Sequence, residues 1–85
     1  MSTLSGISEE DFKILLERAR ELGVGIYGIE PWRNGCYYDV AVCEEYNKDP
    51  ADPDWYMTAF KKFRQTGEPL QYAASYHIPP ELLER

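Results

Sequence analysis

Positive charge is scarce in this sequence. Nine Lys and Arg residues stand against fifteen Asp and Glu residues, which gives a formal net charge of −6. The phosphates of a nucleic acid would be repelled by such a chain, so direct binding to nucleic acid is not expected. The imbalance favours a positively charged partner instead, because carboxylates steer a cationic surface into contact over a long range.

Long apolar runs are also missing. No run approaches the roughly 18 residues that a transmembrane helix requires. The segment from Met1 to Ile7 has neither the basic start nor the apolar centre of a signal peptide. We therefore expect a cytoplasmic protein that makes no membrane contact. A chain of 85 residues has room for one domain, residues 1–85, in which residues 1–7 are a loose lead.

Cysteine and histidine are rare, with two Cys and one His. Cys36 and Cys43 flank a stretch predicted to be one strand, and seven steps of ~3.3 Å place their Cα atoms about 23 Å apart. A disulfide cannot span that distance, so two reduced thiols are expected. Neither cysteine pairs with His77 in the C-x-x-C or H-x-x-x-H spacing of a zinc site. The sequence therefore predicts no metal and no cofactor.

Motifs that carry catalysis are absent as well. The sequence contains no G-x-x-x-x-G-K-[ST], G-x-S-x-G or G-x-G-x-x-G. Glu30 and Asp39 are two acids that a hairpin brings toward one another, as a glycosidase would require. Hairpin carboxylates in an acidic protein are more often solvated charges, and His77 has no recognisable partner for acid–base work. We expect a protein that is not an enzyme.

The first clear structural signal is a helix over residues 8–22. Ser8 is a typical N-cap, and Asp11 follows three residues later as in a capping box. Phe12 and Leu16 belong to an apolar stripe with helical spacing, and Gly23 is typical of the residue after a helix. This helix is predicted from local signals alone.

Two strands and a second helix are expected next. Val24–Ile29 alternates with period two, and Asn34-Gly35 is a strong hairpin signal before a second strand, Cys36–Cys43. The hairpin loop is expected to be widened by Pro31, Trp32 and Arg33. After a polar connection, Asp52 caps a second helix that begins at Pro53 and ends at Gly67.

The chain ends in a third strand. Leu70, Tyr72, Ala74, Tyr76 and Ile78 alternate, Pro79-Pro80 stops the strand, and Glu81–Arg85 adds a final helical turn. The order α-β-β-α-β predicts an α+β fold, in which two helices pack on one face of a small, mainly antiparallel sheet of three strands.

Aromatic residues make up 14% of the chain, including seven Tyr and two Trp, which suits a protein-binding surface. Trp32 at a hairpin tip is hard to bury in so small a core, and Tyr46 lies within an acidic connection. One face of the sheet takes either Tyr38, Tyr72 and Tyr76 or Tyr27 and Tyr37. The alternative for the acidic residues is that they are solvated loop charges. The alternative for Trp32 is packing over the sheet edge, and the alternative for the tyrosines is that they are ordinary strand-forming residues. The predicted partner-binding residues are Glu30, Trp32, Asp39, Glu44, Glu45, Tyr46, Asp49, Asp52 and Asp54.

A resemblance adds to this reading. The segment from Ala19 to Glu30 passes from a helix end through glycine into a strand that ends in an acid, Trp32 follows, and Glu44-Glu45-Tyr46 lies in an acidic link. Over about residues 10–65 the chain resembles the immunity proteins of anticodon-cleaving colicins. The resemblance implies a small acidic cytoplasmic protein that blocks the RNA-binding cleft of a basic ribonuclease.

We therefore expect a protein inhibitor that covers the basic cleft of a nucleic-acid-handling protein, with a nuclease toxin as the leading target. A phage or mobile-element anti-defence protein of the anti-CRISPR type would use the same surface chemistry on another target. A small-ligand-binding module with an aromatic pocket is the alternative from a different class. A monomer or weak dimer is expected.

Overall fold

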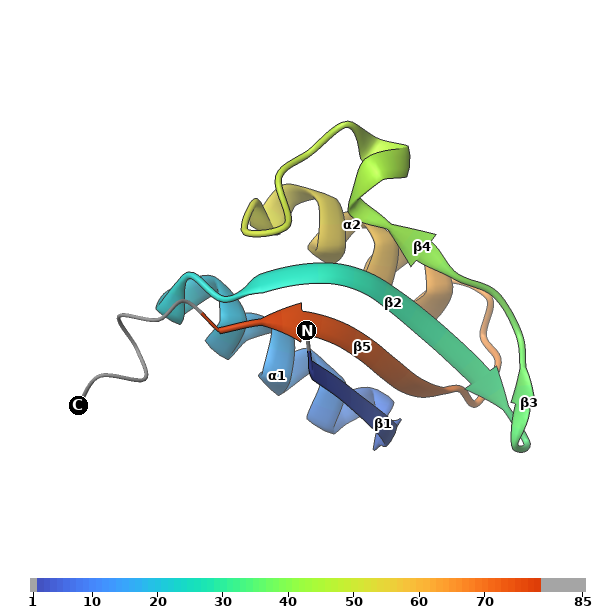
Figure 1. Ribbon diagram of the computed structural model, residues 1–85. Coiled ribbons are helices and arrows are strands. Elements are labelled where there is room, and N and C mark those ends of the chain that lie inside the picture. Colours follow the sequence, from blue (N-terminus) through green and yellow to red (C-terminus); the bar gives the residue numbers. More distant parts are fainter. Residues whose placement is uncertain (1, 79–85) are drawn as a thin grey trace.

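The computed structural model describes residues 2–78. The elements are β1 (Ser2–Ser8), α1 (Glu9–Leu22), β2 (Gly25–Arg33), β3 (Cys36–Tyr37), β4 (Ala41–Val42), the 3-10 helix η1 (Cys43–Tyr46), α2 (Pro53–Arg64) and β5 (Gln71–His77). The α+β class is confirmed: two helices accompany an open, antiparallel sheet of five strands (Figure 1). Within residues 2–78 neither helix has the length and apolarity to cross a membrane. The final turn predicted over Glu81–Arg85 lies outside the described residues.

The predicted count of three strands and the order α-β-β-α-β are wrong, chiefly because the expected loose lead is a strand. β1 pairs with β5 at the edge of a sheet whose strand order is β1-β5-β2-β3, with β4 also paired to β2. The register shifts between Leu4 and Ile7, where Gly6 has a φ of +67°. This bulge breaks the alternation of period two that identifies a strand, so the sequence pattern does not reveal it.

The first helix is confirmed at both ends. The Oγ of Ser8 accepts a hydrogen bond from the backbone N–H of Asp11 at 3.3 Å, and Gly23 adopts a left-handed φ of +74° as the C-cap. α1 buries Phe12, Leu16 and Ala19 against the sheet. Local capping chemistry and the apolar stripe thus define α1 as predicted.

The hairpin turn is tighter than predicted. Arg33 pairs directly with Cys36, so Asn34 and Gly35 alone form the turn, with φ of +51° and +77°. A two-residue turn with two positive φ values matches the twist of the strands that it connects. The prediction of a widened loop is wrong, because Pro31, Trp32 and Arg33 are part of β2.

The strand predicted over Cys36–Cys43 is interrupted. β3 and β4 are separated by residues 38–40, where the Oδ1 of Asp39 accepts a hydrogen bond from the N–H of Val40 at 2.7 Å. Cys43 begins η1 instead of ending a strand. Both thiols are free as predicted, with Cys36 exposed and Cys43 buried.

The second helix begins as predicted and ends early. The Oδ1 of Asp52 accepts a hydrogen bond from the N–H of Asp54 at 2.9 Å, and Pro53 occupies the first helical position. The helix ends at Arg64, whereas Gly67 lies beyond it with a φ of +73°. Trp55 and Tyr56 are both buried.

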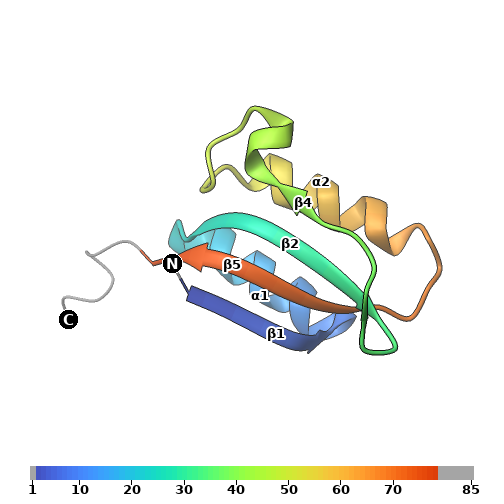
Figure 2. The same cartoon turned by 45° about the vertical axis from the view of Figure 1, so that its right-hand side comes forward.

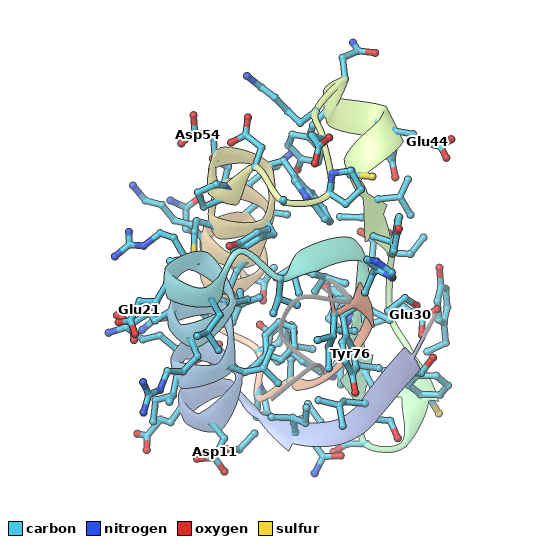
Figure 3. The ribbon with its side chains drawn as sticks, turned by 60° about the vertical axis from the view of Figure 1, so that its left-hand side comes forward. Asp11, Glu21, Glu30, Glu44, Asp54 and Tyr76 are labelled. Atoms are coloured by element: carbon cyan, nitrogen blue, oxygen red, sulfur yellow. The ribbon has the colours of Figure 1, made fainter. Side chains whose placement is uncertain are left out.

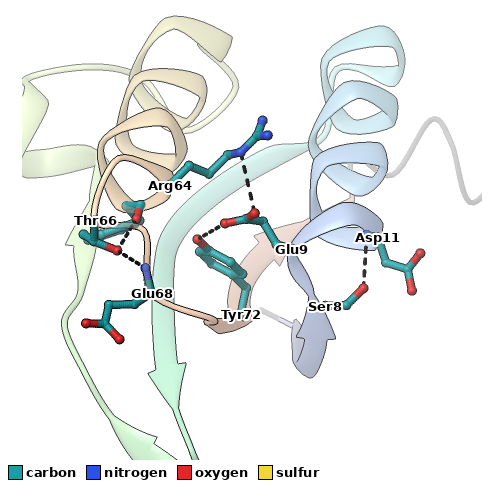
Figure 4. Close-up of polar contacts among 8 residues, drawn as sticks. Ser8, Glu9, Asp11, Arg64, Thr66, Glu68 and Tyr72 are labelled. Atoms are coloured by element: carbon teal, nitrogen blue, oxygen red, sulfur yellow. Dashed lines mark hydrogen bonds and ion pairs between the residues drawn. The ribbon is translucent and has the colours of Figure 1, made fainter.

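Aromatic rings fill the space between the helices and the sheet. Tyr72 of β5 stacks on Phe12 with ring centroids 4.8 Å apart, and Phe60 of α2 meets the Tyr72 ring edge-on at 5.2 Å. Above this cluster, Glu9 accepts a hydrogen bond from the Tyr72 hydroxyl at 3.4 Å and lies 3.8 Å from the Nε of Arg64 (Figure 4). The acidic start of α1 therefore lies beside the basic end of α2.

Both helices lie on the same side of the sheet, and the turned view shows the strands in front of them (Figure 2). The core residues of α1 and α2 accordingly belong to one cluster with Ile26, Ile29 and Tyr72. The opposite side of the sheet has no helix over it among the described residues, as is common for antiparallel sheets.

Candidate functional site

The uncovered side of the sheet is the candidate binding surface, and we call it the open face. Residues directly opposite one another in antiparallel strands point to the same side. Tyr72 packs on α1, so its partners on the neighbouring strands, Ile7 and Pro31, share the helix side. Alternation and pairing then assign the open face to Thr3, Ser5, Gly28, Glu30, Trp32, Tyr37, Val42, Gln71, Ala73, Ser75 and His77.

Small residues form the middle of the open face. Gly28 pairs with both Ser75 and Val42, and Ala73, which neighbouring side chains bury, pairs with Glu30. Two hollows lie on this face. One of about 280 Å³ is lined by Ser5, Gly6, Trp32, Gly35 and Gln71, and one of about 330 Å³ is lined by Tyr27, Gly28, Glu30, Val40, Val42, Cys43, Glu44 and Ser75.

An aromatic pair stands at the hairpin end of the open face. Trp32 is half-buried, and its ring meets the Tyr37 ring edge-on with the centroids 5.9 Å apart. Tyr37, Tyr38 and Val40 are 54%, 40% and 36% exposed, respectively. Three of the large apolar side chains that remain exposed are therefore gathered within four residues, and one of them, Tyr37, lies against the half-buried Trp32.

The structure separates the tyrosines into two sets. Tyr72 and Tyr76 lie on the helix side, where burial raises the pKa of the Tyr72 hydroxyl and the neighbouring Glu9 carboxylate adds to that effect. Tyr37 lies on the open face, and Tyr27 lines the 330 Å³ hollow. Of the two groupings that the sequence allowed, the one that contains Tyr27 and Tyr37 is the one near the open face.

The predicted acidic residues do not form one continuous patch. Glu30 and Glu44 both line the 330 Å³ hollow, although they come from β2 and η1. Asp54 lies at the start of α2, on the helix side of the molecule, as do Asp11 and Glu21 (Figure 3). The structure thus brings Glu30, Trp32 and Glu44 toward the open face and places Asp54 elsewhere.

Four of the predicted acids bind the nearby backbone. Their side chains accept hydrogen bonds from N–H groups one to three residues away, at 2.7 to 3.2 Å; the four acids are Asp39, Glu45, Asp49 and Asp52. Tyr46 is half-buried against the Trp55 ring at 5.7 Å, and Asp52 also lies 4.0 Å from Lys48. These contacts give the acidic connection a structural role in turns and in the cap of α2.

The predicted partner-binding residues did not include Tyr37, Tyr38 or Val40, although Tyr37 and Tyr38 were among the tyrosines considered for a face of the sheet. The signal was the adjacent pair Tyr37-Tyr38, because two consecutive strand residues cannot both face one core. Since Asp39 follows and ends the regular pairing, the chain leaves the sheet with its apolar side chains exposed.

The open face offers contact area and charge. Its strands carry one carboxylate, on Glu30, and His77 is exposed at the end of β5. Within the described part of the chain, no three His, Cys, Asp or Glu side chains are grouped as metal ligands. Burial raises the pKa of the Cys43 thiol, and the adjacent Glu44 raises it further, so this thiol is a weak nucleophile. The arrangement is suited to holding a partner.

Comparisons with protein-family models, with curated proteins and with solved structures found no match for this chain.

Proposed function

We propose that this protein is a small acidic inhibitor that binds a basic, nucleic-acid-handling protein through its open face, with a nuclease toxin as the target. The observation that carries the proposal is the grouping on the open face of exposed Tyr37 against Trp32, together with exposed Val40 in the hollow that Glu30 also lines. Aromatic side chains beside a polar, charged surrounding have the composition of a protein-binding site.

Charge supports the same partner class. Arg33 points to the other side of the hairpin and lies 3.1 Å from Glu68, so it does not offset the acids of the open face. The chain as a whole carries −6, and a partner with an excess of Lys and Arg would be drawn to it from a distance. A nucleic-acid-binding cleft has that excess because it must bind phosphates.

Capture of the partner tests this proposal. The immobilised protein is incubated with extract of its native host at low salt and eluted with a salt gradient, and the Trp32→Ala/Tyr37→Ala variant is compared with the wild type. The matched control is Ile14→Ala/Leu22→Ala, which removes two exposed apolar side chains from α1 instead. Thermal unfolding establishes that all three proteins are folded.

We expect the wild type and the α1 control to capture the same basic protein, to release it as salt rises and to inhibit its action on nucleic acid. The open-face variant should lose most of this capture. A nuclease toxin as partner establishes an immunity protein, whereas a defence nuclease establishes an anti-defence protein. Equal capture by all three proteins, or a captured protein that is acidic, would refute the proposal.

A further inference from the structure

The 330 Å³ hollow on the open face has the chemistry of a binding pocket for one cationic side chain. Its lining includes the apolar side chains of Val40 and Val42, the small residues Gly28 and Ser75, and the acidic residues Glu30 and Glu44. No Lys or Arg lines it among the described residues. A long basic side chain matches this combination, because its alkyl stem is apolar and its head is charged.

Glu30 adds an independent observation. Its side chain is half-buried, yet within residues 2–78 it forms no hydrogen bond and no ion pair. A carboxylate without a partner in the protein is free to form a charge-assisted hydrogen bond with a cation that reaches it. The acids of the α2 connection differ, since Asp49 and Asp52 already accept backbone N–H groups.

We infer that this hollow receives an arginine side chain of the basic partner, an inference that rests on the proposed function. Arginine fits better than lysine for two reasons. Its planar guanidinium pairs with a carboxylate through two parallel hydrogen bonds, and it is more weakly hydrated than an ammonium group. The ring of Tyr27, which also lines the hollow, offers a surface on which a guanidinium stacks favourably.

An isolated arginine unit is the direct probe. Nα-acetyl-L-arginine N-methylamide is titrated into the ¹⁵N-labelled protein, and the amide shifts are followed. The citrulline analogue serves as a neutral probe of the same shape, and the lysine analogue as a cation without the planar head. We expect saturable shifts around Gly28, Glu30, Val42 and Ser75 with the arginine probe, weaker ones with lysine and none with citrulline.

Two kinds of variant test the hollow itself. Glu30→Gln/Glu44→Gln should weaken binding of the probe about five-fold or more, since two charge-assisted contacts are lost. The matched control, Glu10→Gln/Glu21→Gln, removes the same charge from exposed positions of α1 and should leave affinity unchanged. Gly28→Ala places a methyl group 3.5 Å from both Val42 and the backbone oxygen of Ala41, which are ordinary contacts, so the variant should fold normally and weaken binding by narrowing the hollow.

The outcomes separate this inference from the proposed function. The arginine-binding pocket would be refuted by equal shifts with the citrulline probe or by equal weakening from the two glutamine pairs. Capture that depends on Trp32 and Tyr37 would still support the proposed inhibitor function in that case. The opposite combination is saturable probe binding that requires Glu30 and Glu44, together with failure of the capture. It would support the hollow as a cation-binding pocket and refute the proposed function.

Discussion

At the scale of single residues, Tyr56 has an unusual environment. It is fully buried between α2 and the rest of the core, and within residues 2–78 its hydroxyl has no hydrogen-bond partner. Burial raises the pKa of this hydroxyl, which therefore stays neutral. A buried hydroxyl without a partner costs about 1–3 kcal/mol relative to water.

Replacement of that hydroxyl should stabilise the protein. We expect Tyr56→Phe to raise the free energy of unfolding by about 1 kcal/mol, because it removes an unsatisfied polar atom and keeps the ring. Urea denaturation followed by tryptophan fluorescence measures the change. A loss of more than about 1 kcal/mol would show instead that the hydroxyl has a hydrogen-bond partner.

Tyr72 predicts a dependence of stability on high pH. Its pKa is raised in the folded state by burial first and by the Glu9 carboxylate second. The neutral form is therefore favoured by folding, and this contribution is complete below the unfolded pKa of about 10 and is lost as pH rises above it. At pH 11 the loss for one such group is about 1.4 kcal/mol.

The Tyr72→Phe variant tests whether Tyr72 causes this loss of stability at high pH. Although the variant loses the 3.4 Å hydrogen bond to Glu9, its stability should fall less between pH 8 and pH 11 than that of the wild type. Urea denaturation at both pH values gives the comparison. Parallel declines in the two proteins would mean that Tyr72 does not contribute.

At the scale of elements, the hairpin turn places the strictest requirement on backbone angles. Asn34 and Gly35 both have positive φ, and only Gly adopts such angles without steric cost. This turn fixes the pairing of Arg33 with Cys36 and thereby places Tyr37 against Trp32.

We expect Gly35→Ala to lower the free energy of unfolding by about 1 kcal/mol, because a Cβ is strained at a φ of +77° even though space is open around it. Gly28→Ala is the control, since its backbone is not in the left-handed region and its new Cβ makes only ordinary contacts. The urea denaturation midpoints of the two variants show whether Gly35→Ala is the less stable one. Equal midpoints would contradict the strain.

Elements with local signals were predictable from the sequence, and those that depend on distant pairing were not. Ser8, Gly23 and Asp52 identify the helix ends because capping is a contact within a few residues. β1 was not predicted because a bulge at Gly6 disrupts its pattern and because the β5 residues with which it pairs lie 63 to 74 positions away in the sequence. The break at residues 38–40 likewise depends on pairing with β2.

The candidate site was partly predictable for the same reason. Glu30 and Trp32 were identified because an acid and an aromatic residue near a hairpin are visible in sequence. The hollow that joins Glu30 to Glu44 requires the register of β2 with β4 and β5, which no local pattern specifies. The backbone contact of Asp49 appears only in the structure, whereas the capping contact of Asp52 was predicted together with its interpretation as a binding residue.

At the scale of the whole molecule, the net charge of −6 makes association with a basic partner sensitive to salt. We expect the association rate constant to fall about ten-fold or more between 50 and 500 mM salt while the dissociation rate changes less, because steering acts before contact. Stopped-flow measurements at several salt concentrations provide both constants. A salt-independent association rate would contradict electrostatic steering.

The central claim is that the side of the sheet without helices is the part that meets the partner. Hydrogen–deuterium exchange of the protein, free and bound to its captured partner, tests this claim directly. Slower exchange on binding should appear in β2, in residues 36–44 and in β5, and α1 should be unchanged. Slower exchange confined to α1 and α2 would contradict it.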